Sequence, residues 1–209
     1  MKKIYAIVFA LIISVGMIAN IAHSQAKKIG SANDVAASGA AIGQTIADFA
    51  LVDALTNKEV SLASLKGAKG TVLIFVSTQC PVSNAYNERM EKLASDYKAR
   101  GINVIGINSN ATESMDDVKQ HAAKHNLTFT ILKDKGNVIA DRLGAQHTPE
   151  AYLLDSNNVL IYHGRIDNAR TAANVNTNDL RDAMDAVIAG KPVQKTEAAA
   201  FGCSIKRAE

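Results

Sequence analysis

The feature that most constrains the fold is an apolar run, Val72 to Val76, followed four residues later by Cys80-Pro81. A short continuous apolar run predicts a strand buried inside a sheet. Proline suits the first position of a helix, where its missing N–H group costs no hydrogen bond. Cys80 would then cap that helix, where free backbone N–H groups and the helix dipole stabilise a thiolate. The pattern indicates a reactive thiol; the alternative is that Cys80 is a small buried apolar residue.

The rest of the chain alternates between strand and helix patterns. Strands are predicted at residues 48–53, 59–62, 72–76, 102–107, 129–132, 151–154 and 159–162. Helices are predicted at residues 81–98, 114–125, 137–143 and 180–188. A strand–helix–strand order requires parallel neighbours joined by a right-handed crossover, whereas the late hairpin adds antiparallel strands. We therefore expect an α/β domain with a central mixed sheet, helices on both faces and an N-terminal β-hairpin extension.

The first 26 residues have the pattern of a signal peptide. Lys2-Lys3 precedes a mostly apolar stretch at residues 4–19, and either Ser24-Gln25-Ala26 or Ala22-His23-Ser24 offers small residues for cleavage. An uncleaved anchor is the alternative, and either interpretation exports the domain to the periplasm or outside the cell. Residues 27–42 then read as a flexible leader, residues 43–190 as the domain, and residues 191–209 as a C-terminal tail that carries Cys203.

The charge balance argues against some classes of partner. The formal net charge is +3, and two of the positive charges belong to the segment that we expect to be removed. The remaining chain is close to neutral, so we expect no nucleic-acid partner and membrane contact only if the N-terminal segment is retained. In an exported chain with two cysteines, disulfide bonds can persist.

The order of elements, together with three short motifs, resembles a known group of proteins. The motifs are Asp48-Phe49-Ala50-Leu51, Cys80-Pro81 and Thr148-Pro149. From about residue 43 to residue 189 the chain resembles the thioredoxin-fold redoxins, which include the AhpC/TSA peroxiredoxin-like proteins and the TlpA/ResA-like exported thiol oxidoreductases. The resemblance implies a thioredoxin-like fold in which Cys80 is the attacking thiolate.

The resemblance also assigns the substrate groove. It implies that Thr148-Pro149 is a cis-proline loop, which faces the active cysteine and offers backbone groups to an extended thiol or disulfide substrate. Thr148, Pro149, Pro81 and Ser77 are the expected substrate-binding residues.

Departures from the family patterns bear on the reaction. Ser83 stands where disulfide reductases of this fold have the second cysteine of Cys-x-x-Cys, and a hydroxyl cannot perform thiol–disulfide exchange. Leu73 and Ser77 replace the proline and threonine of the peroxiredoxin motif, and Pro149 aligns with the arginine that polarises a peroxide in that family. Arg142 and Arg165 are other sources of positive charge.

Cys203 lies in the tail, in the sequence Phe201-Gly202-Cys203-Ser204-Ile205. From residue 190 an extended chain spans roughly 45 Å, so the tail is long enough to reach Cys80. Three interpretations remain open. Cys203 resolves the oxidised Cys80, as C-terminal cysteines do in many peroxiredoxins; or it forms a static disulfide with Cys80; or the two never meet and Cys203 is free, paired between molecules, or a metal ligand.

The histidines give weaker signals. His121 and His125 have a spacing that can bind a metal, but they continue the apolar stripe of a helix and no third ligand is apparent. His147 directly precedes the Thr148-Pro149 loop, so it could approach Cys80 and lower its pKa or share a Cu(I) or Zn(II) site, although a solvent-facing position is the simpler expectation. We expect no resident metal and no cofactor.

These observations predict an exported thiol-disulfide oxidoreductase that uses Cys80 and Cys203. Its partners would be a protein or small-molecule thiol, disulfide or hydroperoxide substrate and a thiol electron donor. One alternative is a thiol peroxidase that reduces hydroperoxides. Another is a non-catalytic module that binds copper or zinc, or another protein.

Overall fold

The computed structural model describes residues 39–209. The expected signal peptide, residues 1–26, and most of the expected leader, residues 27–42, lie outside the described residues. Where the description begins, the Ala40 N–H donates a hydrogen bond of 3.1 Å to the Leu143 carbonyl oxygen. Within residues 39–209, no helix has the length and apolar character needed to cross a membrane.

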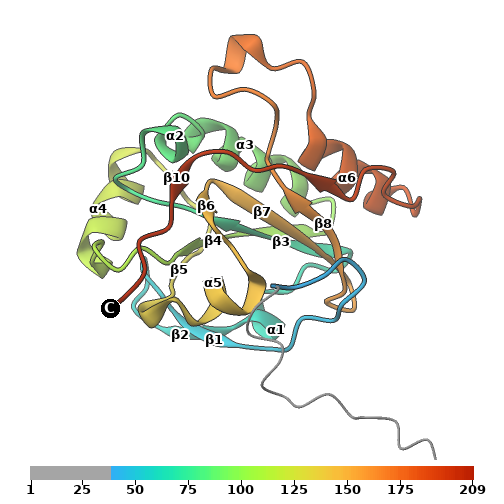
Figure 1. Cartoon of the computed structure of the whole chain (residues 1–209). Coiled ribbons are helices and arrows are strands. Elements are labelled where there is room, and N and C mark those ends of the chain that lie inside the picture. The colour runs from blue at the N-terminus through green and yellow to red at the C-terminus, as the bar shows by residue number, and fades with distance from the viewer. Residues whose placement is uncertain (1–38) are drawn as a thin grey trace, which may run out of the picture. The chain divides into compact units, whose positions relative to one another are not determined.

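Eight strands form one mixed sheet in the order β2-β1-β5-β4-β3-β7-β8-β9, and β10 and β6 form a separate pair (Figure 1). The strands are β1 Ala50–Asp53, β2 Glu59–Ser61, β3 Gly70–Phe75, β4 Ile102–Asn108, β5 Ile131–Lys133, β6 His147–Thr148, β7 Glu150–Asp155, β8 Leu160–Gly164, β9 Glu197–Ala198 and β10 Cys203–Ser204. The helices are α1 Leu62–Leu65, α2 Pro81–Asn84, α3 Asn87–Lys98, α4 Met115–Lys124, α5 Val138–Leu143 and α6 Asp179–Ile188, with short 3₁₀ turns η2 Lys135–Asn137 and η3 Ala172–Asn174.

Strand β3, which leads to Cys80, is a central strand of the sheet. It pairs in parallel with β4 and antiparallel with β7, and every residue from Gly70 to Phe75 is buried. Strands β1 and β2 form the expected N-terminal hairpin. The buried strand and the mixed sheet predicted from the sequence are thus confirmed.

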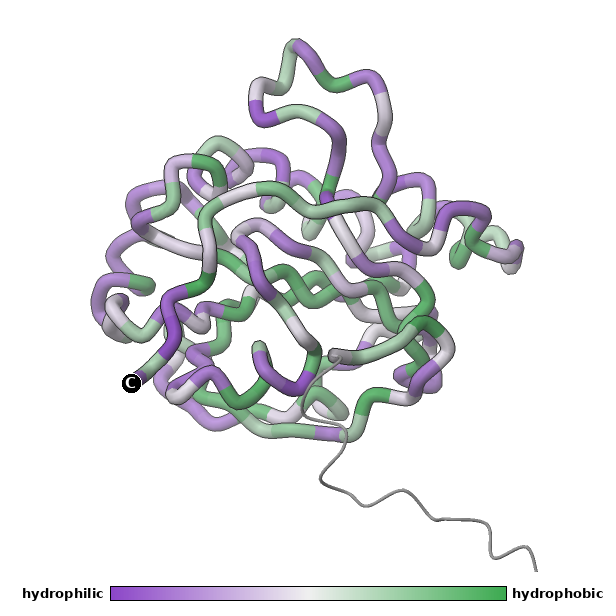
Figure 2. The backbone as a smooth tube through the Cα atoms, in the orientation of Figure 1, coloured by the Kyte–Doolittle hydropathy of each residue, from purple (hydrophilic) through white to green (hydrophobic). Residues whose placement is uncertain are grey.

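Alternate side chains of β3 enter two separate apolar cores, one on each face of the sheet. Val72 and Ile74 pack with the apolar faces of α3, α4 and α6. Leu73 and Phe75 pack on the other face with α1 and α5. Figure 2 shows the hydrophobic residues concentrated along the central strands, whereas the loop between β8 and α6 projects from the body and is largely polar. The expected helices on both faces are confirmed.

The structure differs from the sequence expectation in several places, of which three bear on the site or the core. The single helix expected at residues 81–98 is two helices, because i→i+3 hydrogen bonds at Ala85 and Tyr86 tighten the chain between them. The strand expected at residues 129–132 begins at Ile131, since Phe129 fills the core ahead of it. The tail after residue 190 adds β9 to the edge of the main sheet and pairs β10 with β6. This tail runs across the end of the domain beside β6 (Figure 1).

Candidate active site

Cys80 lies where the chain leaves β3 and enters α2. It is the N-cap residue of α2, and Pro81 is the first helical residue, as the sequence predicted. The Ser83 N–H donates to Cys80 Sγ at 3.3 Å, and the Cys80 thiol donates to the Thr148 carbonyl oxygen at 3.3 Å. Cys80 is 3% exposed, so its sulfur is enclosed by α2 on one side and by β6 on the other.

The surroundings of Cys80 favour the thiolate. Burial raises the pKa of the Cys80 thiol, but hydrogen bonds from the Cys203 thiol and the Ser83 N–H outweigh this cost. The pKa of Cys80 therefore lies below its ordinary value. A thiolate is the nucleophile in thiol–disulfide exchange, so Cys80 is suited to attack.

A buried carboxylate holds the loop that carries Cys80. Glu113, which is 2% exposed, accepts hydrogen bonds from the Ser77 hydroxyl at 2.5 Å and from the Thr78 N–H at 2.8 Å. The Ser77 oxygen in turn accepts the Cys80 N–H at 3.0 Å. Sequence reasoning missed Glu113, since it lies in a polar loop after β4 with no motif that marks it. Glu113 therefore links the loop after β4 to the loop that carries Cys80.

The Thr148-Pro149 peptide bond is cis, as the resemblance implied. A second buried carboxylate, Glu150, supports the loop: one oxygen accepts the Gln146 and His147 N–H groups at 2.8 and 2.7 Å. The other oxygen pairs with His163 Nε2 at 2.6 Å. Burial raises the pKa of Glu150, but the hydrogen bonds from His163 and from the two N–H groups hold it below its usual value. Glu150 was not predicted, although a charged residue opening an otherwise apolar strand is a signal that could have marked it.

Cys203 is placed against this loop by the pairing of β10 with β6. Cys203 lies opposite Thr148, and Ser204 lies opposite His147. The Cys80 thiol donates to the carbonyl oxygen of the same Thr148, so both cysteines lie next to one residue, and both are free thiols in the structure. Burial raises the pKa of Cys203, and the neighbouring Cys80 raises it further. The two cysteines, 123 positions apart in the sequence, therefore meet at one site.

The other expected substrate-binding residues lie at different depths. Pro81 is exposed at the start of α2, and Pro149 is buried behind Thr148. Ser77 is 6% exposed and lies beneath the loop, where its hydroxyl is bonded to Glu113 and to the Cys80 N–H. Ser77 is therefore placed to support the loop that presents Cys80.

The histidines and arginines that the sequence analysis considered do not surround Cys80. His147 lies 3.9 Å from Glu150, and His121 is paired with Asn87. Arg165 is bonded to Asp179 at 2.7 Å, and Arg142 is exposed on α5. In the described part of the chain, no group of three or more His, Cys, Asp or Glu side chains is arranged to hold a metal ion.

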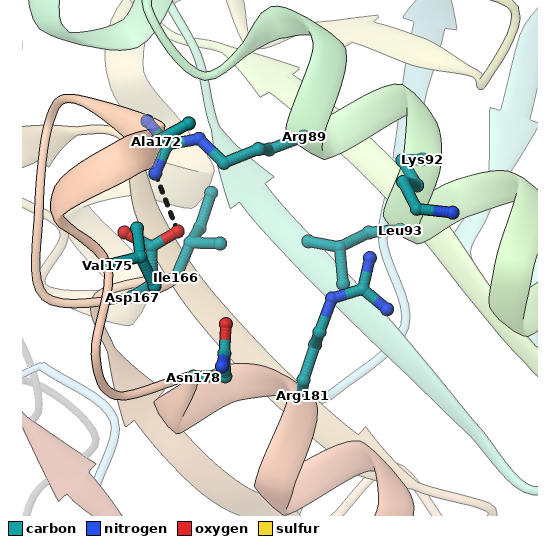
Figure 3. A pocket seen from close by; sticks show the side chains of 9 residues that line it. All are labelled: Arg89, Lys92, Leu93, Ile166, Asp167, Ala172, Val175, Asn178 and Arg181. Carbon is teal, nitrogen blue, oxygen red and sulfur yellow. Dashed lines mark hydrogen bonds and ion pairs between the residues drawn. The ribbon is translucent and has the colours of Figure 1, made fainter.

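A cavity of about 340 Å³ lies between α3, α6 and the loop that joins β8 to α6 (Figure 3). Its lining includes Arg89, which is bonded to Asp167 at 2.6 Å, and Arg181, which is bonded to Asp96 at 3.1 Å. Neither cysteine lines it. Because these arginines are already paired with carboxylates and neither cysteine lines the cavity, we assign it no part in the thiol site.

A relative with an assigned activity is thiol-disulfide oxidoreductase ResA of Halalkalibacterium halodurans. It is 31% identical to this chain over 119 residues, which make up 57% of this chain and 65% of the relative. The match thus spans slightly less than two thirds of that relative.

Solved structures agree with the observed fold. A hypothetical protein from Sinorhizobium meliloti 1021 matches with a TM-score of 0.75 and 34% identity, over 81% of this chain and 96% of that one. The thioredoxin domain of a thiol-disulfide oxidoreductase from Bacteroides vulgatus matches with a TM-score of 0.53 and 19% identity, over 60% of this chain and 89% of that one. The domain has the thioredoxin-like fold that the sequence led us to expect.

The family model that describes the AhpC/TSA family matches residues 42–163, which are more than half of the chain and include both β3 and the cis-proline loop. The protein belongs to the AhpC/TSA family.

Proposed function

We propose that the protein is a thiol-disulfide oxidoreductase in which Cys80 attacks and Cys203 resolves. The observation that carries this proposal is the placement of both cysteines at Thr148: Cys203 lies opposite it in the β10–β6 pair, and the Cys80 thiol donates to its carbonyl oxygen. The pKa of Cys80 is lowered and the pKa of Cys203 is raised. A pair that differs in this way has a defined nucleophile and a defined second thiol. The similarity to ResA supports the same reaction class.

The reaction has two exchange steps. The Cys80 thiolate attacks one sulfur of a substrate disulfide, forms a mixed disulfide and releases the other substrate sulfur as a thiolate. Cys203 then loses its proton and attacks Cys80 Sγ, which releases the second substrate thiolate and leaves a Cys80–Cys203 disulfide. The substrate has gained two electrons. A thiol donor then reduces the Cys80–Cys203 disulfide by the same exchange chemistry and restores both thiols.

The local electrostatics fit this order of events. Two of the causes that raise the pKa of Cys203 are its hydrogen bond to Cys80 and the charge of Cys80. Both causes disappear once Cys80 is held in a mixed disulfide. Cys203 therefore becomes easier to ionise at the step where it has to attack.

The cysteine variants test this assignment. We expect Cys80→Ser to lose disulfide reduction and Cys203→Ser to stop at the mixed disulfide, which mass spectrometry of the intact chain detects after addition of hydroxyethyl disulfide. A Cys80→Ser protein that reduces the disulfide at the wild-type rate would exclude Cys80 as the nucleophile. A redox titration then separates a catalytic from a static pair, since structural disulfides have potentials below about −300 mV.

Peroxide reduction is the second candidate, and family membership favours considering it. In that reaction Cys80 would become a sulfenic acid, and Cys203 would condense with it to a disulfide and water. The surroundings of Cys80 give it less support, because the arginine position is taken by Pro149, and Arg165 is engaged by Asp179. Trapping a sulfenic acid in Cys203→Ser after peroxide treatment, at a rate above that of free cysteine, would favour the peroxidase.

Export is part of the proposal and rests on residues 1–26, whose charged and apolar stretches follow the signal-peptide pattern. We expect the protein in the periplasmic or secreted fraction of its cell. N-terminal sequencing of the isolated protein distinguishes a cleaved signal, with a start near residue 27, from a retained anchor.

A further inference from the structure

The backbone edge next to Cys80 is occupied by the chain's own tail. Cys203 and Ser204 pair antiparallel with Thr148 and His147, and the Ile205 N–H donates to the Gln146 carbonyl oxygen at 2.9 Å. Extended polypeptides commonly bind by adding a strand to a free sheet edge. Because residues 203–205 use the pairing groups of residues 146–148, this edge is closed to another strand.

The tail lies as close to the edge as a chain can. A Cβ atom added to Gly202 would lie 2.0 Å from the Thr148 carbonyl oxygen, so any other residue at position 202 would push the tail away. The next residue is Cys203, which lies opposite Thr148, and the carbonyl oxygen of Thr148 accepts the Cys80 thiol. The tail therefore has the position of a bound peptide substrate, with its cysteine against the active thiol.

The segment after Cys203 is anchored by several contacts. Ile205 is 6% exposed and packs in the core beneath α5. The Lys206 N–H donates to Asn110 at 2.8 Å, and its carbonyl oxygen accepts the Ala111 N–H at 2.9 Å. The Ala208 N–H donates to the Asn137 side chain at 2.7 Å.

The segment before Cys203 is anchored as well. Ala198 is 8% exposed and belongs to β9, which pairs with β8. Phe201 packs edge-on against Tyr86, with ring centroids 6.4 Å apart. Contacts on both sides thus hold the tail over Cys80, and Cys80 itself is 3% exposed.

We propose that the tail excludes polypeptide substrates, so that Cys80 reacts with low-molecular-weight disulfides. This inference rests on the proposed function and adds the size of the substrate to it. Because Cys80 is 3% exposed, a small disulfide needs only a local opening at the tail, whereas a polypeptide needs the whole paired edge. The Cys80 thiolate then forms the mixed disulfide while one small thiolate leaves. Cys203, which lies opposite Thr148 next to Cys80, then attacks Cys80 Sγ and releases the second small thiolate.

The test measures mixed-disulfide formation at Cys80 in the Cys203→Ser background, where Cys80 is the single cysteine of the chain. The probes are hydroxyethyl disulfide and insulin, whose disulfides lie in a polypeptide. Each rate is divided by the rate of free cysteine with the same probe, which removes their intrinsic difference in reactivity. We expect the normalised rate with insulin to be at least about tenfold lower, because only molecules with a displaced tail react.

Adding Gly202→Val to this background releases the tail without altering Cys80. We expect it to raise the insulin rate at least about tenfold and to change the hydroxyethyl disulfide rate less than about threefold. Ala199→Val is the matched control, because Ala199 is exposed on the same tail and its substitution should change neither rate. Phe201→Ala, which removes the packing on Tyr86, is a second release variant if Gly202→Val does not fold.

Equal normalised rates for the two probes in Cys203→Ser, or an insulin rate unchanged in a folded release variant, would overturn the exclusion by the tail. If hydroxyethyl disulfide fails to react in every variant, the proposed function itself is wrong. The two failures are distinguishable, since the first leaves the small-disulfide reaction intact.

Discussion

Cys80 and Cys203 carry the same functional group, and their surroundings give the two thiols opposite acidities. Cys80 receives an N–H donor from the first turn of α2 and the thiol of Cys203, and together these outweigh its burial. Cys203 has burial and the negative charge of Cys80 against ionisation. Burial raises the pKa of both thiols, whereas the interaction between them lowers the pKa of Cys80 and raises the pKa of Cys203. A change at one thiol therefore changes the pKa of the other.

Replacing Cys203 tests this dependence. We expect Cys203→Ala to raise the pKa of Cys80, because a donor that stabilises the thiolate is lost. Cys203→Ser keeps a hydroxyl donor and should raise it less. The ultraviolet absorbance of the thiolate, followed against pH, measures both pKa values.

The same change affects stability. Because the pKa of Cys80 is lower in the folded than in the unfolded protein, the free energy of unfolding increases as pH rises from the lowered pKa to the ordinary thiol value. This increase should be smaller in Cys203→Ala. A Cys80 pKa that is the same in wild type and Cys203→Ala would contradict this account.

At the scale of the elements, the sequence predicted those parts of the site that depend on local chemistry. The end of β3, the N-cap at Cys80 and the position of Thr148-Pro149 follow from apolar runs and proline placement, and the structure has them. Glu113 could not be predicted, because it acts through hydrogen bonds between two loops that are distant in sequence. It lies in the loop after β4, and its partners Ser77 and Thr78 lie in the loop after β3. The break before α3 was also hidden, since Tyr86 continues the apolar stripe of the helix that follows it.

The interaction between these loops gives a prediction on stability. Glu113→Gln removes one acceptor oxygen and places an N–H₂ group among the donors of Ser77, Thr78 and Asn108. Because buried donors are left without partners, we expect the free energy of unfolding to fall by about 2 kcal/mol. Urea unfolding in the presence of a reductant measures it.

Asp116→Asn is the control for Glu113→Gln, since Asp116 is exposed in the first turn of α4. This change should cost less than about 1 kcal/mol, through the weaker interaction with the helix dipole. If the two variants lose the same stability, Glu113 does not hold the active-site loop in the way that its hydrogen bonds suggest.

At the scale of the whole molecule, the C-terminal tail joins parts of the chain that are distant in sequence. It extends the main sheet through β9, covers the cis-proline loop through β10 and ends on Asn110 and Asn137. Strands of two residues have no periodicity to detect, so the sequence predicted that the tail was long enough to reach Cys80 but not the path that it takes. The path matters because it brings Cys203 to Cys80 while both are reduced, so oxidation requires no large change in the fold.

This arrangement predicts that oxidation stabilises the whole domain. A Cys80–Cys203 disulfide closes a loop of 123 residues, 203 minus 80, and so restricts the unfolded chain. We expect the oxidised protein to gain about 5 kcal/mol in free energy of unfolding over the reduced protein, because loop closure of this length lowers the entropy of the unfolded state. Urea unfolding with and without a reductant measures the gain, and Cys203→Ser, which cannot form the bond, should show none.

A gain in Cys203→Ser would mean that the reductant acts elsewhere. An oxidised wild type that is less stable than the reduced one would mean that the tail has to leave its anchors to form the bond, contrary to the placement of both cysteines at Thr148 in the reduced structure.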